Sequence, residues 1–124
     1  MYEYSAKVLR VVDGDTLDLM VDLGMNVHVK ERIRLLGVNT PETYGVKKDS
    51  EEYKRGMEAK QWLMDELCCG MFDLAGCPID TDVVVRIRTH KDEKGKYGRY
   101  LAEVFVGDVS INTRLIHMGY GADY

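Results

Sequence analysis

The chain has 124 residues, which is the size of one domain built around one hydrophobic core. Hydrophobic residues make up 45% of it and charged residues 31%, so the composition excludes a disordered chain and a fibrous repeat. With 17 basic and 21 acidic side chains, the formal net charge is −4. A protein that binds nucleic acid through its bulk charge is basic, so any recognition of phosphate here has to be local.

The cysteines and the lack of a targeting pattern bear on the compartment. Three cysteines, two of them adjacent, are a poor basis for a disulfide framework. The first residues show no basic flank before a long apolar stretch, and no run approaches the roughly 18 apolar residues of a membrane span. We therefore expect a cytoplasmic protein without a membrane partner, in which Cys68, Cys69 and Cys77 are reduced and buried.

Alternation of polar and apolar residues predicts three strands in the first 35 residues. Residues 6–12 are strand-like, and residues 17–23 place Leu17, Leu19, Val21 and Leu23 on one face. After a turn at Gly24 the same period continues to Leu35. The apolar positions of this third strand are Val27, Val29, Ile33 and Leu35. Three strands joined by tight turns form a meander, which must curl or pack against another element.

A helix is predicted next, from Ser50 to about Leu67. Its apolar face recurs at steps of three and four residues, and Glu51 and Glu52 suit the positive end of a helix. Ser50 is a partial capping signal, Gly70 is a plausible end, and residues 71–81 are expected to form a loop. The residues of the predicted face are Tyr53, Met57, Gln61, Met64, Leu67 and Cys68.

The last third of the chain predicts two more strands and a short helix. The strands cover residues 83–87 and 101–106 and flank a polar hairpin at residues 90–98, while Ser110 caps a helix that Gly119 closes. Three strands, a helix, two strands and a short helix fit a mainly β, α+β fold. We expect a five-stranded, partly open barrel of the OB type with one longer helix and one short C-terminal helix.

Two segments near the first strands carry oxygen ligands and a cation. Residues 13–16 read Asp-Gly-Asp-Thr where the first strand turns into the second, and ordinary turn chemistry alone could explain that sequence. Residues 34–43 carry Arg34 on the polar face of the third strand, followed by Asn39, Thr40 and Glu42. Pro41 stiffens this loop, which suits oxygen coordination of a hard cation.

Two basic segments complete the candidates. Residues 96–99 offer a lysine, a tyrosine and an arginine, and residues 47–48 are two lysines. Taken alone, the first is better explained as a solvated hairpin and the second as an exposed charge pair.

These segments together resemble a staphylococcal nuclease-type (thermonuclease) domain. The matching motifs are VVDGDT at 11–16, RLLGVNTPET at 34–43, GMEA at 56–59, KYGR at 96–99 and NTRLIHMGY at 112–120. Each motif is weak alone, but five in order and at similar spacing cover nearly the whole chain. The resemblance implies one OB-fold domain over residues 1–124 and a calcium-dependent phosphodiesterase that cuts DNA or RNA, leaving 3′-phosphate and 5′-hydroxyl ends.

The resemblance also implies a role for each candidate residue. Asp15, Asn39 and the backbone carbonyl of Thr40 would hold Ca²⁺, with Asp13 acting from the outer shell through water. Glu42 would be the general base that activates the attacking water. Arg34 and Arg99 would bind the phosphate, because a guanidinium holds two oxygens and stays charged. The residues beside the substrate would be Lys47, Lys48, Lys96 and Tyr97.

The chain departs from the family pattern in two places. Asn39 stands where the family has a second metal-binding carboxylate, which predicts weaker calcium binding with activity retained. The family also continues with a further C-terminal helix beyond the point where this sequence ends, at Tyr124. A truncated chain, a naturally short protein and a dimer that covers the missing face all remain open, and so does the oligomeric state.

Two other classes of function compete with a nuclease. Relatives of this fold that have lost catalytic residues bind nucleic acid or a partner without cleaving it, and Asn39 favours that alternative. A purely structural domain would have no reason to combine Asp15, Arg34, Glu42 and Arg99. The retained Glu42 and both arginines favour the nuclease.

Overall fold

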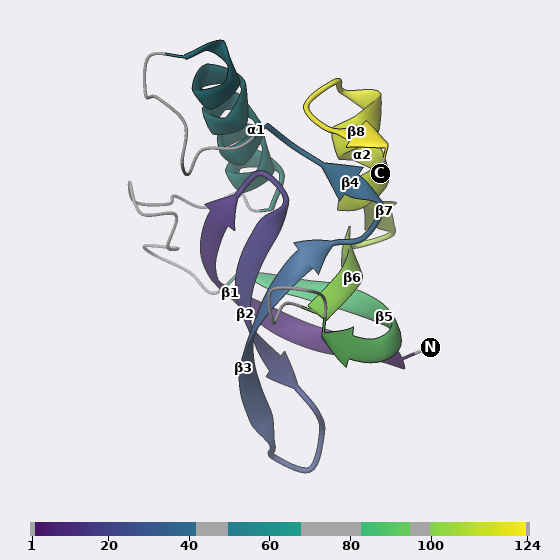
Figure 1. Ribbon diagram of the computed structural model, residues 1–124. Coiled ribbons are helices and arrows are strands. Elements are labelled where there is room, and N and C mark those ends of the chain that lie inside the picture. The colour runs from purple at the N-terminus through teal and green to yellow at the C-terminus, as the bar shows by residue number, and fades with distance from the viewer. Residues whose placement is uncertain (1, 42–49, 68–82, 95–99, 124) are drawn as a thin grey trace.

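The computed structural model describes residues 2–41, 50–67, 83–94 and 100–123 (Figure 1). Three antiparallel strands come first, and they are β1 (Tyr2–Asp13), β2 (Thr16–Asp22) and β3 (His28–Leu35). The strands β5 (Val84–Lys94) and β6 (Tyr100–Val106) form the second half of the sheet.

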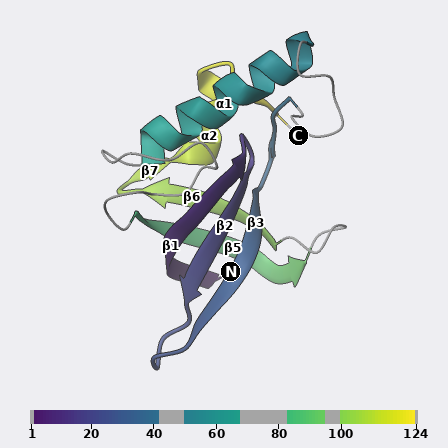
Figure 2. The same cartoon turned by 90° about the vertical axis from the view of Figure 1, so that its left-hand side faces the viewer.

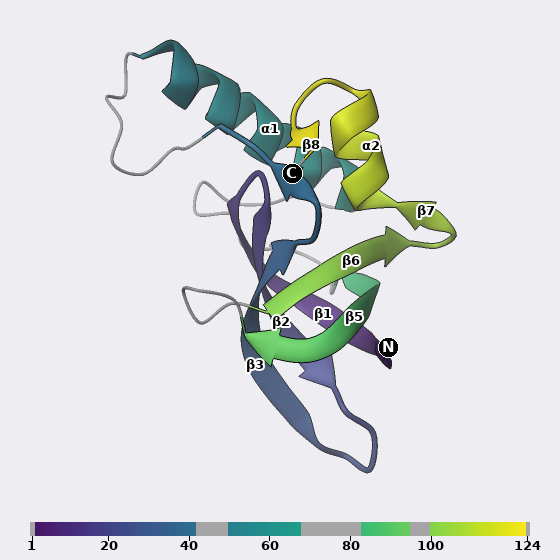
Figure 3. The same ribbon diagram turned by 45° about the vertical axis from the view of Figure 1, so that its right-hand side comes forward.

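The sheet closes on itself. Its five long strands have the order β3-β2-β1-β5-β6, and the end of β3 pairs in parallel with the start of β6, Ile33 opposite Tyr100 and Leu35 opposite Ala102. Figure 3 shows where β3 and β6 lie side by side. Within the described residues, the protein is therefore a closed five-stranded barrel, in which the end of β3 and the start of β6 cover each other's edges.

Two helices lie at one end of the barrel. Helix α1 (Glu51–Leu67) crosses that end, with α2 (Ile111–His117) beside it (Figure 2). The hairpin between β2 and β3 projects from the opposite end (Figure 1). One hydrophobic core joins the barrel interior to Leu63 and Leu67 of α1 and to Leu115 of α2. The predicted α+β fold of the OB type is confirmed, except that the barrel expected to be partly open is closed by the pairing of β3 with β6. Among the described residues, no helix combines the length and the apolar character needed to cross a membrane.

Both predicted helix caps are present. The Ser50 hydroxyl accepts a hydrogen bond from the Tyr53 amide at 3.2 Å, and the Ser110 hydroxyl accepts one from the Thr113 amide at 3.3 Å. Each bond satisfies one amide that the first turn of a helix leaves without an intrahelical partner. Gly119 follows α2 with φ +83°, the left-handed conformation that favours glycine after a helix end.

The predicted buried face of α1 is partly wrong. Met57 is 38% exposed and Gln61 is exposed, whereas Gly56 and Ala59 are buried. The periodicity of the long side chains predicted a face rotated from the observed one, because small residues at 56 and 59 let the helix backbone approach the barrel. The buried residues of α1 are Gly56, Ala59, Lys60, Trp62, Leu63, Met64 and Leu67.

Three other details differ from the sequence prediction. Leu23 and Val27 are 45% and 49% exposed, because the β2–β3 hairpin extends past the barrel core. Strand β5 runs on to Lys94, into the segment predicted as a hairpin from residue 90, since its last residue still pairs with Tyr100. The two-residue strands β4 (Val38–Asn39), β7 (Val109–Ser110) and β8 (Ala122–Asp123) were not predicted. β4 pairs with β8, and β7 pairs with β6.

Asn112 ties α2 to the barrel. It is buried, and its Oδ1 accepts a hydrogen bond from the Val104 amide at 3.0 Å. Its Nδ2 donates to the carbonyl of Leu36 at 2.8 Å and to that of Ala102 at 3.2 Å. One side chain thus joins α2, β6 and the turn that follows β3, which is the turn that leads into residues 38–41.

We expect Asn112→Ala to lower the free energy of unfolding by about 2–3 kcal/mol, because it leaves buried backbone groups without a partner. Urea denaturation measures this. Thr113→Ala, an exposed change in the same helical turn, should stay within about 0.5 kcal/mol of the parent. If Asn112→Ala lowered the free energy of unfolding by less than about 1 kcal/mol, the hydrogen bonds of Asn112 would not hold α2 to the barrel as described.

Candidate functional site

The β1–β2 turn is buried at the helical end of the barrel. Asp13 and Thr16 pair across it, and Asp13 and Asp15 are only 7% and 6% exposed. The Oδ1 of Asp13 accepts a hydrogen bond from the amide of Gly14 at 2.9 Å. An exposed turn of this composition would be explained by turn chemistry alone. Two buried carboxylates are not, since burying a charge is costly unless it has partners.

Gly14 lets this turn fit between two other segments. A Cβ built on Gly14 would lie 2.8 Å from the Cβ of Ala59 in α1 and 2.9 Å from the Oγ1 of Thr40. These separations are too short for real carbon contacts, so only glycine fits this position without a shift of its neighbours. The turn is therefore held against α1 on one side and against the segment after β4 on the other.

The segment after β3 reaches the same place by a short path. The amide of Leu35 donates to the carbonyl of Asp15 at 2.8 Å, and Gly37 has φ +76° in the turn before β4. The pairing of β4 with β8 then fixes Asn39 opposite Ala122. Thr40 follows directly and is buried.

The carboxylate of Asp15 is the centre of the site. Its Oδ2 accepts a hydrogen bond from the amide of Thr40 at 3.2 Å and one from the Nη2 of Arg34 at 3.4 Å. Its Oδ1 accepts one from the hydroxyl of Thr16 at 3.0 Å. The same Nη2 of Arg34 donates to the Oδ1 of Asn39 at 3.1 Å. Asp15, Arg34, Asn39 and Thr40 are called the Asp15 cluster below.

The Asp15 cluster is closed at its base and open on one side. The side chains of Asp15 and Arg34 are 9% and 14% exposed, whereas Asn39 is exposed. An ion pair with so little contact with water is less screened than one on the surface. The Nη2 of Arg34 lies between the Oδ2 of Asp15, which is buried, and the Oδ1 of Asn39, which is exposed. The exposed side of the cluster is where a ligand could reach it.

A cavity of about 510 Å³ borders the Asp15 cluster. Asn39, Thr40 and Pro41 form one wall, and the N-terminal half of α1 and residues 119–122 form the others. Tyr120 lines this cavity while its ring stacks on Trp62 with 5.6 Å between ring centroids. Sequence reasoning did not assign Tyr120 to a pocket, because only the pairing of β4 with β8 brings it beside Asn39.

The predicted site residues divide into two groups. Asp15, Arg34, Asn39 and Thr40 are brought together, and Asp13 flanks the turn that carries Asp15. The other group lies outside the described residues and comprises Glu42, Lys47, Lys48, Lys96, Tyr97 and Arg99. The three cysteines lie outside the described residues as well. Within the part of the chain that the structure describes, no three Asp, Glu, His or Cys side chains gather closely enough to hold a metal ion.

Two positioning residues were missed from the sequence. Ala59 belongs to the GMEA motif at 56–59, which carried the resemblance without a role, and it packs against the Asp15 turn. Asn112 opens the NTRLIHMGY motif, and its hydrogen bonds hold the turn that leads to Asn39. A small residue and a buried amide give no chemical signal in a sequence, so only their motifs could have pointed to them.

The architecture defines the class: an OB-type barrel with a carboxylate-centred polar cluster at its helical end. A sequence model of the family described as Staphylococcal nuclease homologue matches residues 32–124. The chain therefore belongs to the staphylococcal nuclease homologue family.

Curated relatives agree with this assignment. The chain is 33% identical over 117 residues to a thermonuclease of Staphylococcus hyicus and 36% identical over 112 residues to a thermonuclease of Staphylococcus intermedius. These alignments cover 94% and 90% of this chain but 57% and 55% of the relatives, so it spans little more than half their length. It is also 31% identical over 127 residues to Endonuclease YhcR of Bacillus subtilis, covering 98% of this chain and 9% of that protein.

We expect Gly14→Ala to lower the free energy of unfolding by about 1–3 kcal/mol, because the added methyl group overpacks the contact with Ala59 and Thr40. Ala59→Gly alone should cost about 1 kcal/mol through helix propensity. Ala59→Gly removes one of the two clashes that Gly14→Ala creates. The variant that carries both changes should therefore lose less free energy of unfolding than the two single variants lose together. Chemical denaturation of all four proteins measures the coupling, and strictly additive losses would contradict the close contact.

Proposed function

We propose that this protein is a metal-dependent nuclease that hydrolyses the phosphodiester bonds of DNA, RNA or both, with Ca²⁺ as its cofactor. Membership of the family and the names of the thermonuclease and endonuclease relatives support this. The single observation that carries it is the Asp15 cluster. A buried carboxylate, a guanidinium and an amide oxygen from three separate segments meet beside a cavity.

The residues of the Asp15 cluster fit a hard cation in kind. The proposed ligands are the carboxylate of Asp15, the amide oxygen of Asn39 and the backbone carbonyl of Thr40, all oxygen donors of the type that Ca²⁺ accepts. One positively charged nitrogen of Arg34 already bridges the first two oxygens. The hydroxyl of Thr40 is also buried without a hydrogen-bond partner among the described residues. With one carboxylate in this set, we infer weak calcium binding.

Calcium, when bound, would add positive charge beside the scissile phosphate. The chain's own residues would do the rest. Glu42 would accept a proton from the water that attacks phosphorus. Arg34 and Arg99 would bind the non-bridging oxygens, on which negative charge grows as water adds. The P–O5′ bond then breaks and the 5′ oxygen takes a proton, which leaves a 3′-phosphate and a 5′-hydroxyl.

The remaining proposed contacts lie around this centre. Asp13 would act on the metal through water, while Lys47, Lys48, Lys96 and Tyr97 would hold the nucleic acid. This local concentration of cations would allow an acidic protein, with net charge −4, to bind a polyanion.

A noncatalytic nucleic-acid-binding or partner-binding module is the second candidate. One observation favours it: residue 39 is an asparagine. The cluster therefore offers a metal ion one negative charge, whereas two carboxylates would offer two. Such a module would bind single-stranded DNA and leave it intact with or without calcium.

Digestion of single-stranded DNA tests the nuclease directly. We expect cleavage in calcium, none with chelator, and at least about a 100-fold lower kcat for Glu42→Gln and for Arg34→Lys, which loses the fork that binds two oxygens. Arg32→Lys is the matched control. Arg32 lies on the same strand, but its guanidinium pairs with Asp18 at 2.8 Å, and it should keep its activity. Cleavage that survives both the chelator and Glu42→Gln would contradict the proposal.

Asn39→Asp tests the metal site separately. The added carboxylate should raise calcium affinity by about tenfold or more, because the charge of the ligands governs affinity at such sites. Calorimetry with calcium and a bound nucleotide measures it. Asn26→Asp adds the same charge at the tip of the β2–β3 hairpin and should leave the affinity unchanged. Equal affinities in all three proteins would rule out residue 39 as a ligand.

A further inference from the structure

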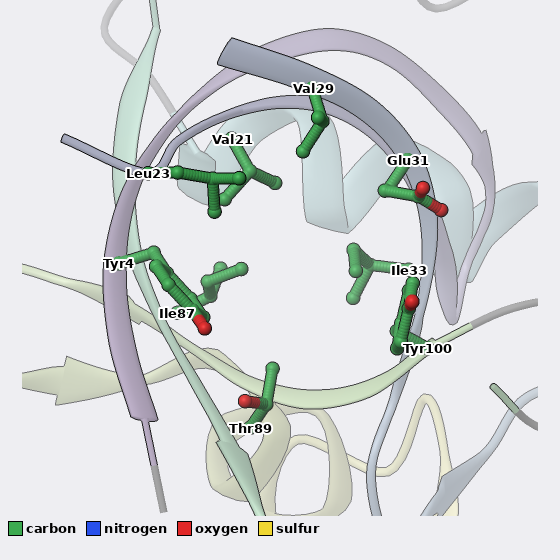
Figure 4. Close-up of a pocket in the computed structure, with 9 residues that line it drawn as sticks. All are labelled: Tyr4, Val21, Leu23, Val29, Glu31, Ile33, Ile87, Thr89 and Tyr100. Atoms are coloured by element: carbon green, nitrogen blue, oxygen red, sulfur yellow. The ribbon is translucent and has the colours of Figure 1, made fainter. Parts of the chain in front are cut away.

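A second cavity lies at the opposite end of the barrel from the Asp15 cluster. Its volume is about 300 Å³, and Leu23 and Val29, on either side of the β2–β3 hairpin, form part of its wall. Asp15, in contrast, precedes β2, and Arg34 lies near the end of β3. Figure 4 looks into this cavity and shows side chains from several strands pointing toward a common space. Of the residues proposed for phosphodiester hydrolysis, the ones that the structure describes do not line it; these are Asp13, Asp15, Arg34, Asn39 and Thr40.

Glu31 breaks the apolar pattern of the barrel interior at this cavity. Val29, Ile33 and Leu35 occupy the inward positions of β3, and by the two-residue period Glu31 occupies one as well. It is half-buried, and it is the one charged side chain among the described residues that line the cavity. Glu31 also takes part in an interaction within the protein, so what matters here is its position and its negative charge.

Two tyrosine rings and the buried Thr89 form the uncharged polar part of the wall. Figure 4 shows Tyr4 on one side of the space, with Tyr100 and Glu31 on the other. Both tyrosines are half-buried and occupy inward positions of β1 and β6. The face of an aromatic ring carries negative potential and attracts cations. The rest of the wall is mainly aliphatic, with Val21, Ile33 and Ile87 buried beneath the opening.

From this lining we propose that the cavity binds a small organic cation, an alkylammonium or arylammonium group with an apolar body. A carboxylate and two aromatic rings complement the positive charge, while the aliphatic wall complements the apolar part. A volume of about 300 Å³ is at the lower end of the range for small-molecule pockets and suits a single compact molecule. A strongly hydrated inorganic cation would lose its water against these apolar side chains without replacement ligands.

Phenyltrimethylammonium is a suitable probe, and tert-butylbenzene is its uncharged counterpart of nearly the same shape. We expect the cation to bind the full chain at one saturable site in an NMR titration, with the largest shifts at Glu31, Ile33 and Ile87. The uncharged compound should bind about tenfold more weakly, because it gains nothing from the carboxylate or the ring faces.

Three variants make this test specific. Glu31→Gln keeps the shape of the side chain and should weaken binding of the cation about tenfold, while Glu51→Gln, the same change on the exposed first turn of α1, should not. Val29→Phe fills the cavity and should abolish binding of both compounds. Equal binding of the two compounds, an unchanged affinity in Glu31→Gln, or no binding of the cation at millimolar concentration would overturn the proposal. These results are independent of the nuclease assay, because the Asp15 cluster and the described lining of this cavity share no residue.

Discussion

The carboxylate of Asp15 is the constraint on which the rest of the site depends. Its hydrogen bonds to the amide of Thr40 and to Arg34 join the β1–β2 turn to the end of β3 and to the segment that follows β3. That carboxylate is buried, so losing these partners would leave a charge without compensation in a poorly solvated place. The same bonds therefore stabilise the turn and hold the side chains that could act on a phosphate.

The barrel supplies the rigidity that this arrangement needs. Closure of the sheet by β3 and β6 fixes where β3 ends, and Asn112 fixes the turn that follows it. Gly14 lets α1 pack directly onto the turn from the other side. Residues 15, 34 and 39–40 are thus placed by the core of the protein, which is what preorganised binding of a charged group requires. At the other end of the barrel, the described lining of the cavity comes from the barrel strands and Leu23, and neither α1 nor α2 contributes to it.

Much of this could be predicted from the sequence, for identifiable physical reasons. Alternation of apolar residues predicted the barrel strands, because one face of each packs on the core, and Ser50 and Ser110 predicted the helix starts. Packing that depends on small residues could not be predicted, as the rotated face of α1 shows at Gly56 and Ala59. The inward position of Glu31 was not predicted, because the alternating residues before and after it in β3 are apolar. The resemblance to the nuclease family predicted that Asp15, Arg34, Asn39 and Thr40 lie close together. Their hydrogen bonds to one another could not be predicted from the sequence.

The most direct measurement is the rate of DNA cleavage by Asp15→Asn in the presence of calcium. Asparagine has nearly the shape of aspartate and still offers an oxygen to the amide of Thr40, so circular dichroism should show an unchanged fold. If the Asp15 cluster is the active centre, loss of its one carboxylate lowers the rate at least about 100-fold. A folded Asp15→Asn protein that cleaves DNA at the parent rate would contradict the account.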